Sequence, residues 1–288
     1  MKYFQKDDSD EIATSKVKLT KRRVSIIFYS TLFCLIVLCV SIFLFEPLAK
    51  YQSAHTALDS GQYDTAIQIF TELSNYKDSA EMVLECKYQK ADHLLSSGEY
   101  KEALAVFSEI IDYKDSLAQY KQSQYRLARQ LLTANRFDEA IKTYQQLGSY
   151  ENSEENLKEA KYKKAKSLAT CDINQAIYIF NSINNYRDSH SWSVTLNAIK
   201  EYQGTWEEMN TSVPSQVIIC GTTVATVYFP YSNKANVHRQ QIVLYDDKLV
   251  NTSGSSSQYV LEHGVLKVIT DYTTVQYTKI SDSSKIPE

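Results

Sequence analysis

Eight polar side chains are spaced so that together they could hold an anion. They form four pairs whose members are three residues apart, which places both members on one face of a helix. The pairs become basic along the chain, and a basic helix face attracts an acidic peptide, a chain-terminal carboxylate or an anionic wall polymer. The pairs are Gln52 with His55, Gln89 with Asp92, Arg126 with Arg129, and Lys163 with Lys166.

A second interpretation of these charges requires no ligand. Three more lysines add positive charge near the last pair, but three glutamates lie among them, which is typical of a solvated helix face with balanced charge. The two groups are Lys158, Lys161 and Lys164 against Glu154, Glu155 and Glu159. Both interpretations stay open. Charge reversal at Arg126 and Arg129 distinguishes them, because only the first predicts weaker capture of a partner.

The sequence contains no motif for catalysis, nucleotide binding or metal binding. It has no glycine-rich phosphate loop, no nucleophile elbow and no His-Glu-x-x-His, and its histidines are dispersed. These are His55, His93, His190, His238 and His263. The net charge of −3 gives no reason to expect nucleic acid as a partner. We therefore expect a protein that is not an enzyme and carries no cofactor or metal; an envelope enzyme with dispersed site residues, or an assembly factor, is a minor alternative.

The cysteines do not form a disulfide framework. Cys34 and Cys39 lie in a long apolar segment, and the other three are widely scattered. We expect Cys86 and Cys171 to be small buried residues in helices. A single bridge between these two is the alternative.

The elements that carry the four pairs repeat along the chain. The segment Tyr-Lys-Asp-Ser begins at Tyr76 and Tyr113, and variants begin at Tyr150 and Tyr186, so the spacings are 37, 37 and 36 residues. A fixed period of this size indicates a solenoid of helical hairpins, which presents a long open surface for binding. A helix after Ser189 is expected to close the stack through Val194, Leu196 and Ile199.

The recurring segment has an expected structural role in the turns between hairpins. Its last two residues are good helix N-caps, whose side-chain oxygens can accept from the first amides of the next helix. Its tyrosine ring can pack between neighbouring hairpins. The predicted turn residues are Tyr76, Asp78, Ser79, Tyr113, Asp115, Ser116, Tyr150, Asn152, Ser153, Tyr186, Asp188 and Ser189.

Two motifs give a resemblance to a known repeat family. The pattern Gly-x-Tyr-x-x-Ala-[Ile/Leu]-x-x-Phe occurs from Gly61 to Phe70 and from Gly98 to Phe107. It resembles the tetratricopeptide repeat, although the period is longer than usual and the usual helix-ending proline is missing. The resemblance covers residues 48–202. It implies a protein-binding scaffold of the kind found in many membrane-anchored surface proteins of Gram-positive bacteria.

An apolar segment precedes the repeats. Residues 24–45 contain no charged side chain, and about 20 apolar residues are enough to span a bilayer. The alternative is a cleaved signal peptide, which usually has a shorter apolar stretch. Basic residues cluster before the segment, so residues 1–23 should be a cytoplasmic, solvated basic tail. The sequence thus predicts a single-pass plasma-membrane protein whose C-terminal region is extracytoplasmic.

The composition changes after the repeats. Residues 204–288 hold several short runs rich in β-branched residues, separated by turn residues, and so predict a small antiparallel β-barrel or sandwich of six or seven strands. The opening Gly204-Thr205-Trp206 and the closing Tyr277-Thr278-Lys279 resemble a lipocalin-like or calycin-type module. A ligand cavity is not expected in so short a module, and Trp206 is expected in the core.

The predicted architecture is therefore a multidomain α+β chain with one transmembrane helix, an α-solenoid of four hairpins and a β module. The first functional hypothesis is a membrane-anchored scaffold that binds a protein or peptide partner through the first helices. The alternative is a ligand- or cell-wall-binding protein that acts through the β module and uses the repeats as a stalk.

Overall fold

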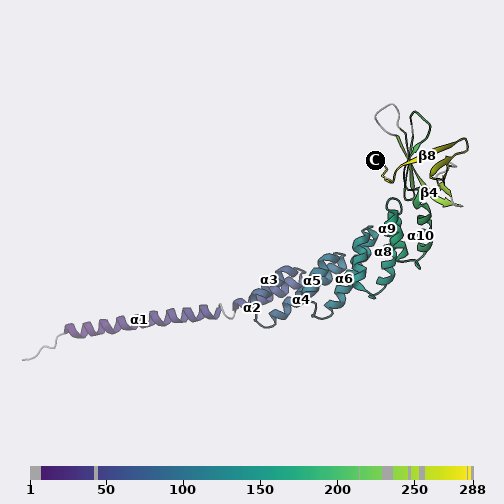
Figure 1. Ribbon diagram of the computed structural model, residues 1–288. Coiled ribbons are helices and arrows are strands. Elements are labelled where there is room, and N and C mark those ends of the chain that lie inside the picture. Colours follow the sequence, from purple (N-terminus) through teal and green to yellow (C-terminus); the bar gives the residue numbers. More distant parts are fainter. Residues whose placement is uncertain are drawn as a thin grey trace, which may run out of the picture. The chain divides into compact units, whose positions relative to one another are not determined.

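The protein is described by a computed structural model (Figure 1). The structure describes residues 8–41, 45–213, 215–228, 236–245, 248–252, 257–283 and 285–286. The chain folds into two compact units, Met1–Ser123 and Gln124–Glu288. This division does not coincide with the predicted boundary between solenoid and β module, so that boundary stays a prediction.

The first unit begins with a long helix, α1 (Asp8–Val40). Its part from Arg23 to Val40 is long and apolar enough to cross a membrane, and a signal sequence would meet the same criteria. The predicted solvated tail is helical from Asp8 onward; its residues 1–7, and residues 42–44 of the predicted span, lie outside the described residues. The described side chains from Arg23 to Val40 are all exposed, as suits a segment with an apolar environment of its own.

Helical hairpins follow α1 in this unit. The first consists of α2 (Glu46–Asp59) and α3 (Tyr63–Leu73), and the second of α4 (Ser79–Ser97) and α5 (Tyr100–Glu109). Alanines at the helix contacts are fully buried, because a small residue lets two helix backbones approach closely. They are Ala54, Ala66, Ala91 and Ala103, beside the buried rings of Phe70 and Phe107.

Helix α6 (Ser116–Thr133) crosses the boundary between the units. The second unit continues with α7 (Phe137–Leu147), α8 (Ser153–Leu168), α9 (Ile173–Asn181), α10 (Ser189–Ala198) and a short 3₁₀ helix, η2 (Ile199–Tyr202). The predicted closing helix is thus α10 with η2. Leu196 and Ile199 are buried as expected, whereas Val194 is 55% exposed and does not cover the stack.

The described strands after η2 form a closed, antiparallel barrel of eight strands in chain order. It is a barrel and not a sandwich because β1 pairs with β8, which joins the two edges of the sheet. The strands are β1 (Gly204–Glu208), β2 (Gln216–Cys220), β3 (Thr223–Tyr228), β4 (Asn236–Tyr245), β5 (Lys248–Asn251), β6 (Gln258–Glu262), β7 (Val265–Ile269) and β8 (Thr274–Ser281).

The barrel and the fourth hairpin share one hydrophobic core. Buried side chains run from Ala165 and Phe180 of the hairpin through Ile199 to Trp206 and Leu266 inside the barrel. The predicted core position of Trp206 is confirmed: the side chain is 2% exposed, and its Nε1 donates to the Tyr202 carbonyl at 2.9 Å.

The turn between β2 and β3 fixes the barrel to the fourth hairpin. Thr222 N donates to the carbonyl of Ala169 at 2.9 Å. Gly221 has φ +58°, and a Cβ at this position would lie 1.9 Å from the same carbonyl oxygen. Only glycine allows this approach. The barrel is therefore an integral part of the second unit.

Candidate protein-binding surfaces

In the first unit, the predicted binding positions differ in how exposed their side chains are and in whether those side chains already contact other residues. Gln52 and Asp92 are exposed, whereas His55 and Gln89 are half-buried. The ring of His55 packs edge-on against Phe70, with 5.2 Å between the ring centroids. Gln89 Nε2 donates to Glu85 at 2.9 Å, so its amide is already used within the helix.

In the second unit, the predicted positions are exposed and basic. Arg126 and Arg129 form no ion pair with any described residue, while Lys163 lies 3.8 Å from Glu159. Lys166 lies over two aromatic rings, with its Nζ 5.3 Å from Trp192 and 5.6 Å from Tyr162. The arginine pair is thus the part of the predicted site most available to an anion. A single groove through all four pairs stays a prediction.

The repeat turns use their acidic residue differently from the sequence-based expectation. Asp78, Asn152 and Asp188 stand at the N-cap positions of α4, α8 and α10, but no side-chain hydrogen bond caps these helices. The aspartates instead accept from the tyrosine that opens the preceding hairpin. The hydroxyls of Tyr51, Tyr88 and Tyr162 donate to Asp78, Asp115 and Asp188 at 2.6, 2.6 and 2.7 Å.

These phenol–carboxylate bonds alter the acidity of both partners. The hydrogen bond from Tyr88 is the main reason that the pKa of Asp115 lies below its usual value. The same bond, with burial and the negative charge of Asp115, raises the pKa of Tyr88 to about 12. A carboxylate held ionised in this way is an acceptor and not a general acid at neutral pH. The contact therefore locks the hairpin and performs no chemistry.

Three of the four turns place a cation over the opening tyrosine. Lys77 Nζ lies 4.3 Å from the ring centroid of Tyr51, Lys114 Nζ 4.9 Å from that of Tyr88, and the Arg187 guanidinium 5.3 Å from that of Tyr162. The cation's own φ is positive in each turn, at 54°, 47° and 48°. The sequence does not reveal this arrangement, since it depends on an unusual backbone conformation that no residue type signals.

The third turn departs from this arrangement. Glu151 and Asn152 replace the cation and the aspartate. The hydroxyl of Tyr125 instead accepts from Asn156 Nδ2 at 3.1 Å. The buried ring of the third hairpin also differs, because Tyr144 stands where the other hairpins have Phe70, Phe107 and Phe180. Its hydroxyl is buried without a hydrogen-bond partner.

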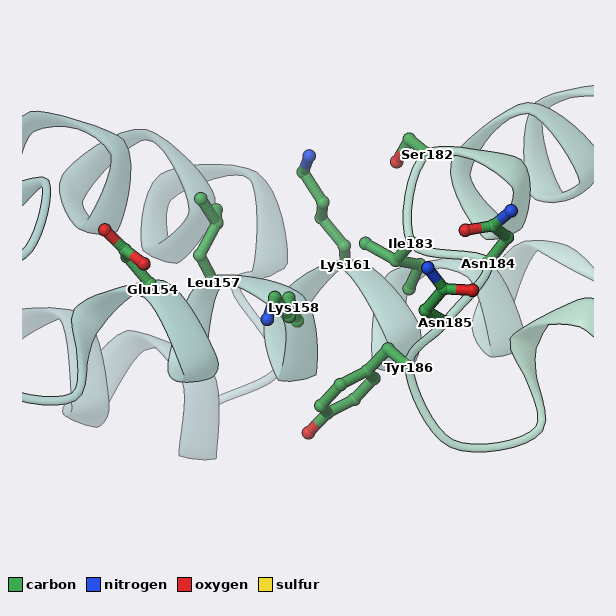
Figure 2. Close-up of a pocket in the computed structure, with 9 residues that line it drawn as sticks. All are labelled: Glu154, Leu157, Lys158, Lys161, Ser182, Ile183, Asn184, Asn185 and Tyr186. Carbon is green, nitrogen blue, oxygen red and sulfur yellow. The ribbon is translucent and has the colours of Figure 1, made fainter.

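A pocket of about 440 Å³ lies in the second unit beside α8 (Figure 2). One wall is α8, and the other is the turn that joins α9 to α10. Figure 2 shows Lys161 rising from α8 between Glu154 and the turn, while the carboxylate of Glu154 lies away from Asn184 and Asn185. The lining residues are Glu154, Leu157, Lys158, Lys161, Ser182, Ile183, Asn184, Asn185 and Tyr186. The sequence did not reveal this pocket, because its two walls come from segments about 25 residues apart.

The cysteines are free thiols in the structure. Cys86 is buried in α4 as predicted, and burial is the main reason that the pKa of its thiol rises to about 11. The prediction for Cys171 was wrong. It lies exposed in the turn before α9, where the fourth unit has lost one residue, and it is not bonded to Cys86. Within the described ranges, no group of three or more His, Cys, Asp and Glu residues could hold a metal ion.

Comparison with known families gives a match to part of the repeat region. Residues 94–166 match the tetratricopeptide repeat family. The match begins in α4 and ends in α8, so it includes the arginine pair and part of the Lys158–Lys161 pocket wall. Repeats of this family suggest a scaffold for protein interactions. No curated protein matches the chain.

Proposed function

We propose that the chain is a single-pass plasma-membrane protein whose tetratricopeptide-like repeats bind a protein or peptide partner outside the cytoplasm. The exposed arginine pair of α6 is the observation that carries the proposal. Arg126 and Arg129 are exposed on α6, and neither forms an ion pair with a described acidic side chain. A surface of this kind supplies electrostatic steering and partner choice without catalysis.

The filled interior of the barrel favours a scaffold role over binding of a ligand inside the barrel. Its interior is filled by buried side chains such as Trp206, Ile242, Leu249 and Leu266. We further propose that the barrel is related to calycin-type modules. Lys279 Nζ lies 5.5 Å from the Trp206 ring centroid, so the opening and closing motifs of the module meet. Binding through the barrel's outer surface remains the alternative.

Photo-crosslinking in intact cells tests the proposal. A photoreactive residue replaces Arg129 in one variant and Gln258 of β6 in a matched variant. A discrete protein adduct at position 129 but not at position 258 is the expected result. Adducts at position 258 alone would make the barrel the binding surface and the repeats a stalk, and the proposal would then be wrong.

A further inference from the structure

One lysine has an ion-pair partner in the second hairpin but none among the described residues in the fourth. Lys87 of α4 and Lys161 of α8 are equivalent, since each lies eight residues after the buried serine that begins its helix, Ser79 or Ser153. Lys87 Nζ pairs with the carboxylate of Glu109 at 2.7 Å. Lys161 forms no ion pair with any described residue, although it is half-buried against the pocket.

Lys161 has no such partner because residues at the end of the hairpin's second helix, and in the turn after it, differ between the two hairpins. Glu109 lies two residues after the buried Phe107, and the equivalent position after Phe180 is Ser182. Asp112 is likewise replaced by the neutral Asn185, and Ile111 by Asn184. The fourth hairpin thus has no acidic side chain at the positions of Glu109 and Asp112, although Asp188 still corresponds to Asp115, and it has kept the lysine.

The pocket is therefore lined by two lysines, which lie between Glu154 and the asparagines (Figure 2), and by two apolar side chains. Lys161 and Lys158 supply positive charge. Lys158 Nζ also forms an ion pair at 3.5 Å with the carboxylate of Glu155, which is not a lining residue. Glu154 is the acidic residue of the described lining, and it lies at the far end from the asparagines (Figure 2). Leu157 of α8 and Ile183 of the turn are the apolar aliphatic side chains of the lining.

We propose that this pocket binds a carboxylate of a peptide, with Lys161 as its ion-pair partner. The carboxylate takes the place that Glu109 occupies beside Lys87. The amides of Asn184 and Asn185 can bond the peptide backbone, and Leu157 and Ile183 accommodate a neighbouring apolar side chain. A polymer of phosphates would use the lysine and the amide N–H groups but not the apolar side chains of Leu157 and Ile183, so a peptide suits the lining better.

This site is separate from the surface on which the proposed function rests. Lys161 and Lys163 are two residues apart, which places them about 200° apart around α8. A failed crosslink at Arg129 would therefore leave the pocket untouched, and a pocket that binds nothing would leave the proposed groove untouched.

The test measures fluorescence anisotropy with the full chain in detergent micelles. One fluorescein-labelled probe carries Leu-Asp-Leu with an amidated end, and a second carries a neutral sequence with a free C-terminal carboxylate. These probes separate an acidic side chain from a chain terminus, and binding of either one supports the proposal. The amidated Leu-Asn-Leu peptide should not bind, and binding of the charged probe should weaken as salt is added.

Three variants make the test specific. Lys161→Gln should weaken binding about fivefold, the upper range for one partly exposed charge pair. Ser182→Glu should rebuild the ion pair of the second hairpin and weaken binding about tenfold, because the lysine is then occupied and the new carboxylate repels the anionic probe. Lys87→Gln removes the equivalent lysine that already has a partner, and it should leave probe binding unchanged.

The circular dichroism spectrum of each variant shows whether it is folded. Ser182→Glu adds a charge pair and removes none, so it tests the pocket even if Lys161→Gln unfolds. Equal binding by Ser182→Glu and the wild type would overturn the proposal. So would an equal loss in Lys87→Gln, which would indicate non-specific charge attraction. Binding of a glycerol-phosphate oligomer in place of both peptides would assign the pocket to a different ligand class and would also overturn it.

Discussion

The hydroxyl of Tyr162 donates a hydrogen bond to Asp188 across 26 residues of chain, at 2.7 Å. It joins the first helix of the fourth hairpin to the turn that follows that hairpin. The same tyrosine packs edge-on against Phe180 and Tyr186, and Arg187 lies over its ring. One phenol therefore connects both helices of a hairpin to the next turn, and related contacts in the first and second hairpins make this a unit of the repeat.

Removal of this hydroxyl should weaken the second unit. Tyr162→Phe keeps the ring contacts but removes the shorter hydrogen bond to Asp188, which still accepts from Trp192 Nε1 at 3.2 Å, so we expect a loss of about 1 kcal/mol in unfolding free energy. The chain's two tryptophans, Trp192 and Trp206, lie in this unit, so their fluorescence in a urea titration follows its unfolding. Tyr178→Phe is the control, because Tyr178 is 76% exposed on α9. Equal midpoints for the two variants would contradict the role given to the hydroxyl.

The same bond predicts how stability depends on pH. The hydrogen bond from Tyr162 is the main cause that lowers the pKa of Asp188 below its usual value of 3.8. A group with a depressed folded pKa stabilises the folded state above its unfolded pKa and loses that effect as pH falls through the folded value. The urea midpoint of Asp188→Asn should therefore lie below that of the wild type at neutral pH, and the difference should shrink below about pH 4. A difference that stays constant down to about pH 2 would be inconsistent with this linkage.

The turn between β2 and β3 should not tolerate a side chain. Gly221→Ala brings a Cβ against the Ala169 carbonyl in addition to the strain of a positive φ, and we expect a loss of more than about 2 kcal/mol. Gly264→Ala is a matched control, since Gly264 has φ +79° with no atom within 4 Å of an added Cβ. It should cost only the backbone strain, about 1 kcal/mol. Tryptophan fluorescence measures both, and equal losses would show that the contact with the hairpin is unimportant.

The arginine pair should control partner capture if the proposed function is right. With a photoreactive residue at the exposed Gln130, the double variant Arg126→Glu and Arg129→Glu should reduce the adduct about tenfold, because it reverses two charges that face an anionic partner. Lys142→Glu on α7 makes a comparable change elsewhere on the second unit and should have little effect. An unchanged adduct in the double variant would favour the solvated-surface interpretation.

The exposed Cys171 allows a direct measurement of membrane orientation. A membrane-impermeant maleimide should label intact cells that express the full chain, if the region after α1 is extracytoplasmic. Cys86 and Cys220 are buried and should react slowly. Cys171→Ser should abolish most of the labelling. Labelling that requires permeabilised cells would place the repeats in the cytoplasm and contradict the proposed topology.

Several elements could be predicted from the sequence because their signals are local. The period of 36 or 37 residues, the alanines at helix contacts and the glycines at helix ends report hairpins without any long-range information. The apolar helix before the repeats and the β-rich composition after residue 204 are also local. The number of strands was underestimated, because short strands such as β5 have too few residues to give a clear alternation.

The contacts that decide the sites are not local. Whether Asp188 caps a helix or accepts from Tyr162 depends on a backbone turn with positive φ at Arg187, and residue type alone favours neither outcome. That Lys161 lacks a described acidic partner becomes visible only when α8 and the turn between α9 and α10 lie together. The barrel is joined to the fourth hairpin by a shared hydrophobic core and by a close backbone approach at Gly221, neither of which the sequence signals.

The sequence by itself therefore determined the repeat architecture, the candidate membrane helix and the basic arginine pair, since periodicity and composition act over a few helical turns. Only the tertiary structure decided the phenol–carboxylate locks, the closure of the barrel and the basic pocket beside α8. These depend on which side chains meet across 20 to 80 residues of chain, and that choice is made by packing of the whole unit.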